Sequence, residues 1–327
     1  MWLRRLAALA AAVALVAGAF AVRDRRASKD GSATATTTVG GTTGDTTPAK
    51  GFTLICATEL RALCEGALNS GMTVRIEPVA TTAAKFAAAS DPRAVGTAWL
   101  TVDPWPGLSD GRRPTAGTSF GSLNRLSYSP IGIVVRKPRN GKLATACGGK
   151  VTLACVGDKG GTAWTALGGL AEWQVLKPTL TDPLTSASGP ASLAAAVREQ
   201  RNDQGLALID LQSDPTFNTW LRNFLRPSGL ATALEQAVLQ QVYDAVVVPE
   251  AEFTATAAPS GRFAFEGASP FSAELVLAPA AGVTVPKSIV EALTAQAAKA
   301  GWRAGAAPTK AVDANLVAGM QTVWKEN

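Results

Sequence analysis

The most informative segment of this chain reads Asp182-Pro-Leu-Thr-Ser-Ala-Ser-Gly-Pro-Ala-Ser-Leu-Ala-Ala-Ala-Val197. A strand is predicted just before this segment, which continues with hydroxyl residues, a glycine and an alanine-rich run with helical propensity. This order places the unpaired N–H groups of a helix N-terminus beside Thr185, Ser186 and Ser188. Such a terminus can bind an oxyanion or another small molecule rich in hydrogen-bond acceptors. Serine and threonine are also preferred helix caps, so capping alone is the simpler interpretation.

Strands and helices alternate on both sides of this segment. Toward the N-terminus, strands are predicted over 52–56, 72–79 and 97–102, with helices over 58–68 and 81–90 between them. This order is typical of an α/β fold in which helices cover a parallel sheet. Further strands are predicted over 129–135, 150–156, 173–180, 206–210, 244–248 and 273–278. Helices are predicted over 162–170, from the hydroxyl cluster through Gln200, and over 215–225, 230–242, 288–300 and 308–325. A turn is predicted at 137–141.

The composition disfavours catalysis. The chain has no histidine, which removes the Ser-His-Asp and Cys-His routes to nucleophilic catalysis and every His-containing zinc site. Neither a P-loop nor a G-x-G-x-x-G pattern is present. A hydrolase that acts through Ser-Lys or two acids stays open, but no nucleophile is paired with a base. We therefore expect no enzyme and no cofactor.

Charge gives no indication of a nucleic-acid partner. The 31 Lys and Arg residues outnumber the 25 Asp and Glu residues, for a net charge of +6. Five of these bases and one acid lie in the first 26 residues, which leaves 26 bases and 24 acids elsewhere. The later part of the chain has no concentrated basic stripe. Its loop carboxylates Asp203, Asp210 and Asp214 are scattered and form no metal signature.

The N-terminus carries an export or anchoring segment. A basic start, Met1–Arg5, precedes an apolar run of seventeen residues, 6–22, and we interpret residues 1–26 as either a cleaved signal peptide or a membrane anchor. Residues 27–50 are rich in Thr, Gly, Ser and Ala and are predicted to be a flexible linker.

Four cysteines indicate disulfides. Cys56 and Cys64, and likewise Cys147 and Cys155, are separated by the same number of residues. An even count in an exported protein favours disulfides. Three connectivities are open, and we expect the two local ones, with buried free thiols as the alternative. The spacing is too long for a structural zinc site.

Four motifs carry a resemblance to a known family. In chain order they are Cys56-Ala-Thr-Glu-Leu60, Ser129-Pro-Ile-Gly-Ile-Val-Val135 with Lys137, Asp182–Gly189, and Tyr243-Asp-Ala-Val246. Together they resemble the type II periplasmic solute-binding proteins of ABC importers, most closely the molybdate and sulfate branch and its actinobacterial relatives. The resemblance spans about residues 51–280 and implies two α/β lobes with mainly parallel sheets and a ligand between them. It places the first part of lobe 1 at 51–130, lobe 2 at 131–248, and the return to lobe 1 with closing helices at 249–327.

The resemblance also assigns binding residues. Thr58 lies where the family often has a ligand-binding serine, Ser186 and Ser188 match the helix N-terminus of the second lobe, and Asp244 matches an acidic residue that binds ligand or orders the hinge. The full predicted ligand-binding set is Thr58, Trp105, Ser129, Thr185, Ser186, Ser188, Tyr243 and Asp244. Simpler interpretations stay open: a helix cap for Thr58, cleft-edge packing for Trp105 in its proline-stiffened loop, and core packing for Tyr243.

The function implied is extracytoplasmic capture of a small ligand, with an oxyanion among the candidates, an ABC permease as partner and the membrane contacted through the N-terminal segment. The paired cysteines depart from the general family pattern, and the apolar run has no lipid-anchor cysteine. These departures keep an alternative open, in which a membrane-tethered domain senses or scaffolds at the cell surface with the same fold.

Overall fold

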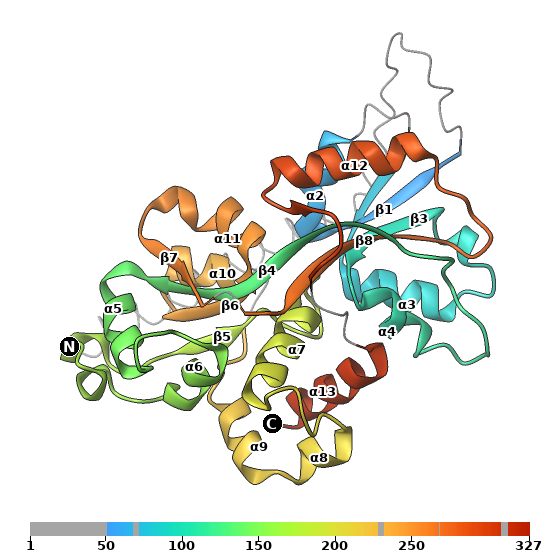
Figure 1. Ribbon diagram of the computed structural model, residues 1–327. Coiled ribbons are helices and arrows are strands. Elements are labelled where there is room, and N and C mark those ends of the chain that lie inside the picture. Colours follow the sequence, from blue (N-terminus) through green and yellow to red (C-terminus); the bar gives the residue numbers. More distant parts are fainter. Residues whose placement is uncertain (1–50, 68–71, 228–231, 268, 309–312) are drawn as a thin grey trace, which may run out of the picture. The chain divides into compact units, whose positions relative to one another are not determined.

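The computed structural model describes residues 51–67, 72–227, 232–267, 269–308 and 313–327 (Figure 1). The chain divides into the units Met1–Thr36 and Thr37–Asn327, and all described residues belong to the second. The signal or anchor predicted at 1–26 and the linker predicted at 27–50 lie outside the described residues. In the described part of the chain, no helix is both long and apolar enough to cross a membrane.

The first half of the sheet is built from three parallel strands and one antiparallel strand. Strands β1 (Thr53–Ala57), β2 (Thr73–Glu77) and β3 (Ala98–Val102) pair in parallel in the order β2-β1-β3. Strand β8 (Ser272–Pro279) runs antiparallel to β3. Every residue of β3 is buried, as expected for a strand covered on both faces.

Helices pack against this half of the sheet. Helix α2 (Arg61–Gly66), preceded by the 3₁₀ turn η1 (Thr58–Leu60), lies beside α12 (Lys287–Lys299). Helix α3 (Val79–Ala88) lies beside α4 (Trp105–Asp110) (Figure 1).

Strand β4 (Asn124–Arg136) joins the two halves of the sheet. Its first part, 124–130, pairs with β8, and Ser127 and Tyr128 also pair with the short strand β9 (Arg303–Ala304). Its last part, 131–136, pairs with β6 (Ala245–Pro249) and β7 (Phe263–Glu266). Strand β5 (Pro178–Leu180) completes the second half, parallel to β6. Figure 1 shows β4 passing from one half to the other.

The predicted α/β class is confirmed, with one correction to the strand directions. The pairs β1–β2, β1–β3 and β5–β6 are parallel, as expected, but among the described strands every pairing of β4 and β8 is antiparallel, so the sheet is mixed rather than mainly parallel. The reason is geometric. Strand β4 leaves the first half and β8 returns to it, so two adjacent strands must run in opposite directions.

Several segments in the second half are helical where strands or a turn were expected. The predicted strands at 150–156 and 206–210 are replaced by helices α6 (Leu153–Lys159) and α8 (Leu208–Ser213). The predicted turn at 137–141 begins helix α5 (Lys137–Ala146), and only β5 remains of the strand at 173–180. Short apolar runs fit a helix as well as a strand, and local caps decide between them. Thr152, for example, accepts a hydrogen bond from the Cys155 amide and starts α6.

The remaining described elements include the alanine-rich helix that follows the Asp182–Gly189 segment. The 3₁₀ turns η4 (Trp164–Leu167), η5 (Ala171–Trp173) and η7 (Ala258–Ser260) occupy loops of the second half. The helices are α7 (Gly189–Gln200), α9 (Pro215–Arg222), α10 (Ala233–Glu235) with a π turn at Gln236–Gln240, α11 (Glu250–Thr256) and α13 (Ala314–Glu326). Helix α7 is buried from Gly189 to Val197 and contacts both β6 and β8. Its small alanine side chains let it pack between the two halves of the sheet.

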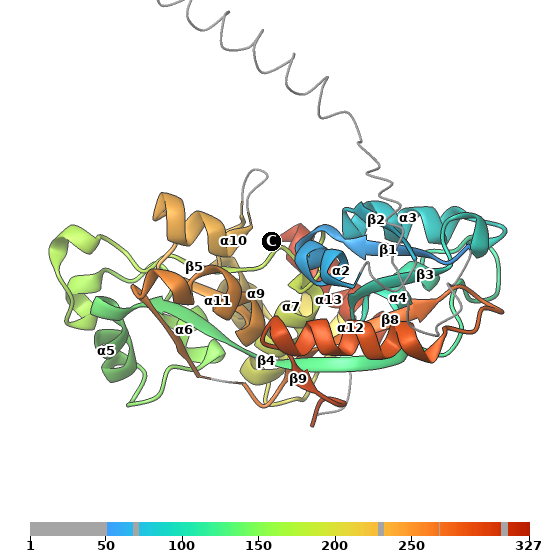
Figure 2. The ribbon, with the colours of Figure 1, turned by 90° about the horizontal axis from the view of Figure 1, so that it is seen from above.

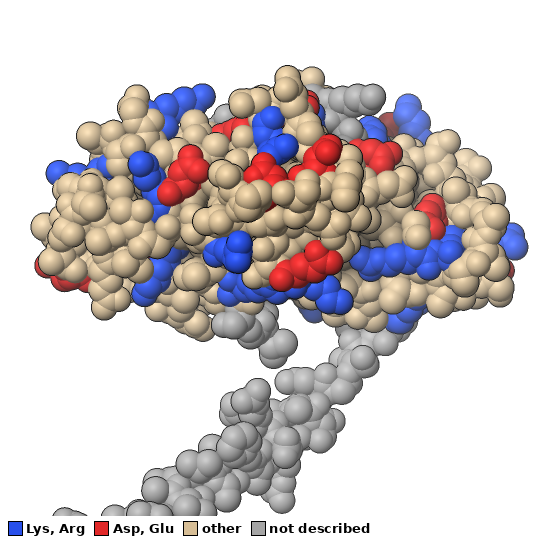
Figure 3. All heavy atoms as spheres, turned by 90° about the horizontal axis from the view of Figure 1, so that it is seen from below, with Lys and Arg blue, Asp and Glu red and all other residues tan. Residues whose placement is uncertain are grey.

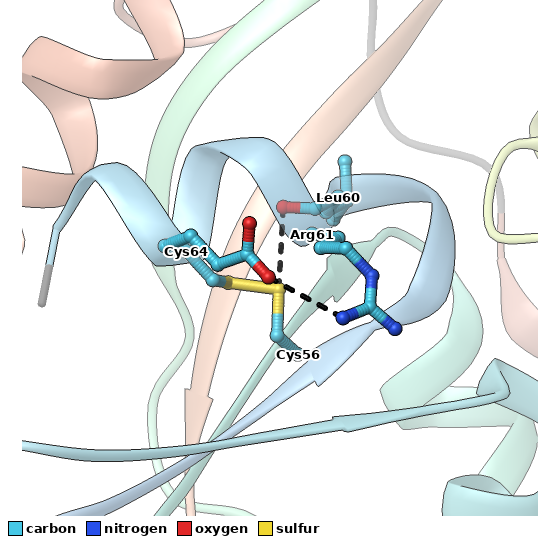
Figure 4. Close-up of a disulfide and its surroundings, with 5 residues drawn as sticks. Cys56, Leu60, Arg61 and Cys64 are labelled. Atoms are coloured by element: carbon cyan, nitrogen blue, oxygen red, sulfur yellow. Dashed lines mark hydrogen bonds and ion pairs between the residues drawn. A yellow bond between two sulfur atoms is a disulfide. The ribbon is translucent and has the colours of Figure 1, made fainter. Parts of the chain in front are cut away.

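Both expected disulfides are present. Cys56–Cys64 links the end of β1 to α2, and Cys147–Cys155 links the end of α5 to α6. Figure 4 shows the first of these beneath the turn that carries Leu60 and Arg61. This cross-link encloses η1 and therefore fixes the position of Thr58 and Glu59 relative to the sheet.

Two glycine substitutions test how tightly the α7 N-terminus is placed. A Cβ on Gly189 would lie 2.0 Å from the Asp182 carbonyl oxygen, whereas a Cβ on Gly141, inside α5, would meet nothing within 4 Å. We expect Gly189→Ala to lower the free energy of unfolding by about 3 kcal/mol because the backbone must move. Gly141→Ala should raise it by about 0.5–1 kcal/mol. Denaturant unfolding measures both, and equal effects of the two substitutions would contradict this packing.

Candidate functional site

A cavity of about 300 Å³ lies where the two halves of the fold meet. Its lining comes from α2, α10 and α11 and from the two residues just before α7. Figure 2 shows how these helices are arranged. From the first half it is lined by Thr58, Glu59, Leu60, Ala62, Leu63, Val102, Ala300 and Trp302. From the second half it is lined by Ala187, Ser188, Thr232, Glu235, Pro249, Ala251, Glu252, Ala255 and Thr256. A concave, mostly apolar pocket with a few polar groups is the usual form of a small-molecule site.

The loop before α7 is shaped by Asp182. Its carboxylate accepts hydrogen bonds from the Leu184 amide, at 2.9 Å, and from the Thr185 hydroxyl, at 2.6 Å. The backbone turn continues with the Ser186 amide donating to the Asp182 carbonyl. This self-contained turn presents Ala187 and Ser188 to the cavity and leaves Thr185 exposed outside it.

A carboxylate of the first half bonds to the residue just before the N-cap of α7. The Ala187 amide donates a 3.0 Å hydrogen bond to Oε1 of Glu59. A helix N-terminus favours negative charge because its first amides are unpaired. Glu59 therefore places a carboxylate from within the chain next to the helix N-terminus at which an anionic ligand was predicted.

Trp105 makes a second contact between the halves. Its indole Nε1–H donates to the carbonyl oxygens of Ser186, at 3.0 Å, and Ala187, at 3.1 Å. The side chain is fully buried and belongs to helix α4 rather than to the stiff loop that was expected. The prolines on either side of it start the helix, a position that proline tolerates.

Glu252 is the most perturbed acid of the cavity. Burial raises its pKa to about 7, with a further contribution from the charges of Glu59 and Glu235, while a hydrogen bond from Ser188 lowers it. In that bond the Ser188 hydroxyl donates to Oε2 of Glu252 at 3.0 Å. The pKa of Glu59 is also raised, because protein atoms around the carboxylate disfavour its charge, although the residue as a whole remains exposed. Perturbed acids in a cleft are common at functional sites.

Glu235 enters the cavity wall through a capping box. Its carboxylate accepts from the Thr232 amide at 2.8 Å, and the Thr232 hydroxyl accepts from the Glu235 amide at 3.2 Å. The motif fixes the start of α10. It therefore holds a third carboxylate near Glu59 and Glu252.

Three of the residues in the predicted ligand-binding set stabilise the fold. Ser129 is buried and accepts from the Ala251 amide at 2.9 Å, which caps α11. Tyr243 is buried and its hydroxyl donates to the Arg226 carbonyl at 3.1 Å.

Asp244 is the third of these residues. It is buried, forms an ion pair with Arg139, and accepts from the Trp164 indole and the Lys177 amide at 3.2 and 3.0 Å. The Arg139 guanidinium also lies over the rings of Trp164 and Trp173. This cluster gives the buried charge of Asp244 a complete set of partners.

The structure brings together only part of the predicted set. Thr58 and Ser188 line the cavity. The other six lie outside its lining: Trp105, which donates to the Ser186 carbonyl, Ser129, Thr185, Ser186, Tyr243 and Asp244. Sequence reasoning missed the cavity acids Glu59, Glu235 and Glu252. A usable indication existed for Glu235, since Thr232-Ala-Leu-Glu235 has the spacing of a capping box.

Two further observations bear on ligand type. Among the described residues, no group of three or more His, Cys, Asp or Glu side chains could hold a metal ion. On the face drawn in Figure 3, Lys and Arg side chains are interspersed with Asp and Glu.

Comparisons with known proteins show the fold. No protein-family model and no curated protein matches the chain. Among solved structures, iron-bound HitA from Pseudomonas aeruginosa aligns at 11% identity and a TM-score of 0.52, over 84% of this chain and 99% of HitA. A periplasmic thiamin binding protein aligns at 10% identity and 0.52, over 84% of this chain and 95% of its own. The chain therefore has an α/β periplasmic-binding-protein-like fold.

The predicted molybdate and sulfate branch stays a prediction. The sulfate-binding protein SubI from Mycobacterium tuberculosis H37Rv aligns at 16% identity, over 84% of this chain and 91% of SubI, with a TM-score of 0.45. A TM-score below 0.5 does not support assigning the chain to that branch.

The raised pKa of Glu252 predicts a pH-dependent stability difference. A carboxyl whose pKa rises from 4.5 to about 7 on folding binds more protons in the folded state, so it lowers stability as the pH increases through that range. Glu252→Gln removes this effect and can still accept from Ser188. We expect the variant to be more stable than the parent by roughly 1–3 kcal/mol above pH 7, with little difference below pH 4.5.

Urea unfolding across this pH range measures the difference. Glu291→Gln is the matched control, because Glu291 is 63% exposed on α12 and lies outside the cavity. A stability difference for Glu252→Gln that does not change with pH would show that Glu252 titrates normally.

Proposed function

We propose that this protein is an extracytoplasmic solute-binding protein that captures a small ligand in the cavity between its halves, for delivery to an ABC importer. The observation that carries the proposal is the cavity itself. It is lined from both halves and receives the N-terminus of α7. The likeness to solute-binding proteins supports the proposal through the fold alone.

In this proposal the two halves are lobes that move relative to each other. Strands β4 and β8 cross between them, and β4 exchanges partners between Pro130 and Ile131. We place the return to lobe 1 between Glu266 and Ser272 rather than at 249, because β7 still pairs with the second half of the sheet. A ligand that contacts both walls of the cavity would bind the closed state better and so increase its population.

The disulfides and the N-terminal sequence support an extracytoplasmic location for the binding domain. Two disulfides are typical of proteins in oxidising compartments. With residues 1–26 as signal peptide or anchor and 27–50 as linker, the binding domain would be secreted or held at the outer face of the cell membrane. An ABC permease is the partner that this arrangement suits.

One observation favours the alternative of a surface domain that senses or scaffolds without transport. The Ala187 amide, between the predicted binding residues Ser186 and Ser188, already has Glu59 as its partner. The hydrogen bond between the Ala187 amide and Glu59 could instead hold the two lobes in one fixed arrangement. In that case a protein partner, rather than a solute, would be the ligand.

A thermal-shift screen with small-angle scattering separates the two functions. The proposal predicts that at least one solute among amino acids, amines, sugars and oxyanions raises the Tm and reduces the radius of gyration. The combined variant Thr58→Ala and Ser188→Ala should weaken that solute's binding about tenfold, because it removes one or two hydrogen bonds. Thr185→Ala should bind normally, since Thr185 lies outside the cavity. No shift with any solute class would favour the surface-domain alternative.

A further inference from the structure

The geometry points to a small organic cation, an ammonium group on an apolar body, as the ligand of the cavity between the halves. This inference rests on the proposed function, because it assumes that the cavity binds a solute. It concerns which chemical class the cavity walls select.

The charge of the lining is entirely negative. The lining includes three carboxylates, Glu59, Glu235 and Glu252, and among the described residues that line the cavity none is Lys or Arg. They come from three separate elements, η1, α10 and α11. An anion would enter against this charge, whereas a cation would relieve the repulsion among the three acids.

Three hydrogen-bond donors at the cavity are already bonded to these acids. The Ala187 amide donates to Glu59, the Ser188 hydroxyl donates to Glu252, and the Thr232 amide donates to Glu235. An ionised carboxylate has about four acceptor positions, so these bonds leave acceptor capacity on each acid. The acceptor capacity that the three acids retain suits a ligand that donates hydrogen bonds, as an ammonium group does.

The rest of the lining defines the body of the ligand. Leu60, Leu63, Val102, Ala251 and Trp302 contribute apolar or aromatic surface. Aromatic rings attract cations as well as apolar groups. The volume of about 300 Å³ is at the lower end for small-molecule sites and favours a ligand with few heavy atoms.

A bare metal ion fits these walls less well. Metal sites need several ligand atoms converging on one point at about 2–2.6 Å. Among the described residues the acids do not form such a group. Carboxylates spread around an apolar cavity can instead contact an ammonium group from different sides.

The test uses probes of equal size and different charge. We would titrate the protein with butylammonium, 1-butanol and butanoate, and with sulfate as the oxyanion, and measure Kd by calorimetry and Tm by fluorimetry. Butylammonium should bind at least about tenfold more tightly than 1-butanol, and at about ten times its Kd it should raise the Tm by roughly 3 °C. Butanoate and sulfate should produce no shift.

Variants locate the effect in the cavity. Glu59→Gln combined with Glu252→Gln should abolish the preference for butylammonium over 1-butanol, while Glu291→Gln should keep it. A preference that survives in the double variant would overturn the inference, because the cation would then bind elsewhere.

The remaining outcomes distinguish this inference from the proposed function. Tighter binding of butanoate or sulfate, lost in Thr58→Ala with Ser188→Ala, would overturn the cation selectivity and leave the receptor function standing. If these probes and the wider solute screen all leave the Tm unchanged, both the inference and the receptor function fail.

Discussion

The hydrogen bond from the Ala187 amide to the Glu59 carboxylate is the interaction on which the organisation of this site depends. It connects the turn after β1 to the N-terminus of α7, and so connects the two halves of the sheet at the wall of the cavity. Both partners are held in place locally. The Cys56–Cys64 disulfide encloses the turn that bears Glu59, and the close approach of Gly189 to Asp182 fixes the loop that presents Ala187. A carboxylate therefore already accepts from the amide just before the N-cap of α7, and the three cavity acids retain acceptor capacity for a ligand.

Much of the fold was predictable from the sequence. The strands at β1, β3, β6 and β8 are apolar runs with clear ends, and the helix after Gly189 is marked by hydroxyl residues and alanines. The two disulfides followed from matched spacing. Prediction failed at α6 and α8, where short apolar segments carry no periodicity long enough to distinguish a helix from a strand. The direction of β4 relative to β8 also depends on the path of the whole chain, which local patterns do not encode.

The site was predicted only in part, for a physical reason. The sequence located the tip of α7 and the turn at Thr58, because both lie where a strand runs into a helix. It could not show that Glu59 reaches Ala187, since those residues are separated by 128 positions and meet only through tertiary packing. The acids Glu235 and Glu252 look like ordinary first-turn residues of two helices, where negative charge is stabilising. Their shared cavity exists only once α10 and α11 are folded against η1.

The most direct measurement is the pH dependence of the Ala187 backbone amide by NMR, in the parent protein and in Glu59→Gln. The account predicts that the amide proton resonance of Ala187 follows the ionisation of Glu59, with a midpoint above the ordinary 4.5 because the pKa of this carboxyl is raised, and that the dependence disappears in the variant. An Ala187 resonance that does not change with pH, or that changes equally in both proteins, would show that Glu59 does not occupy the helix tip and would contradict the account.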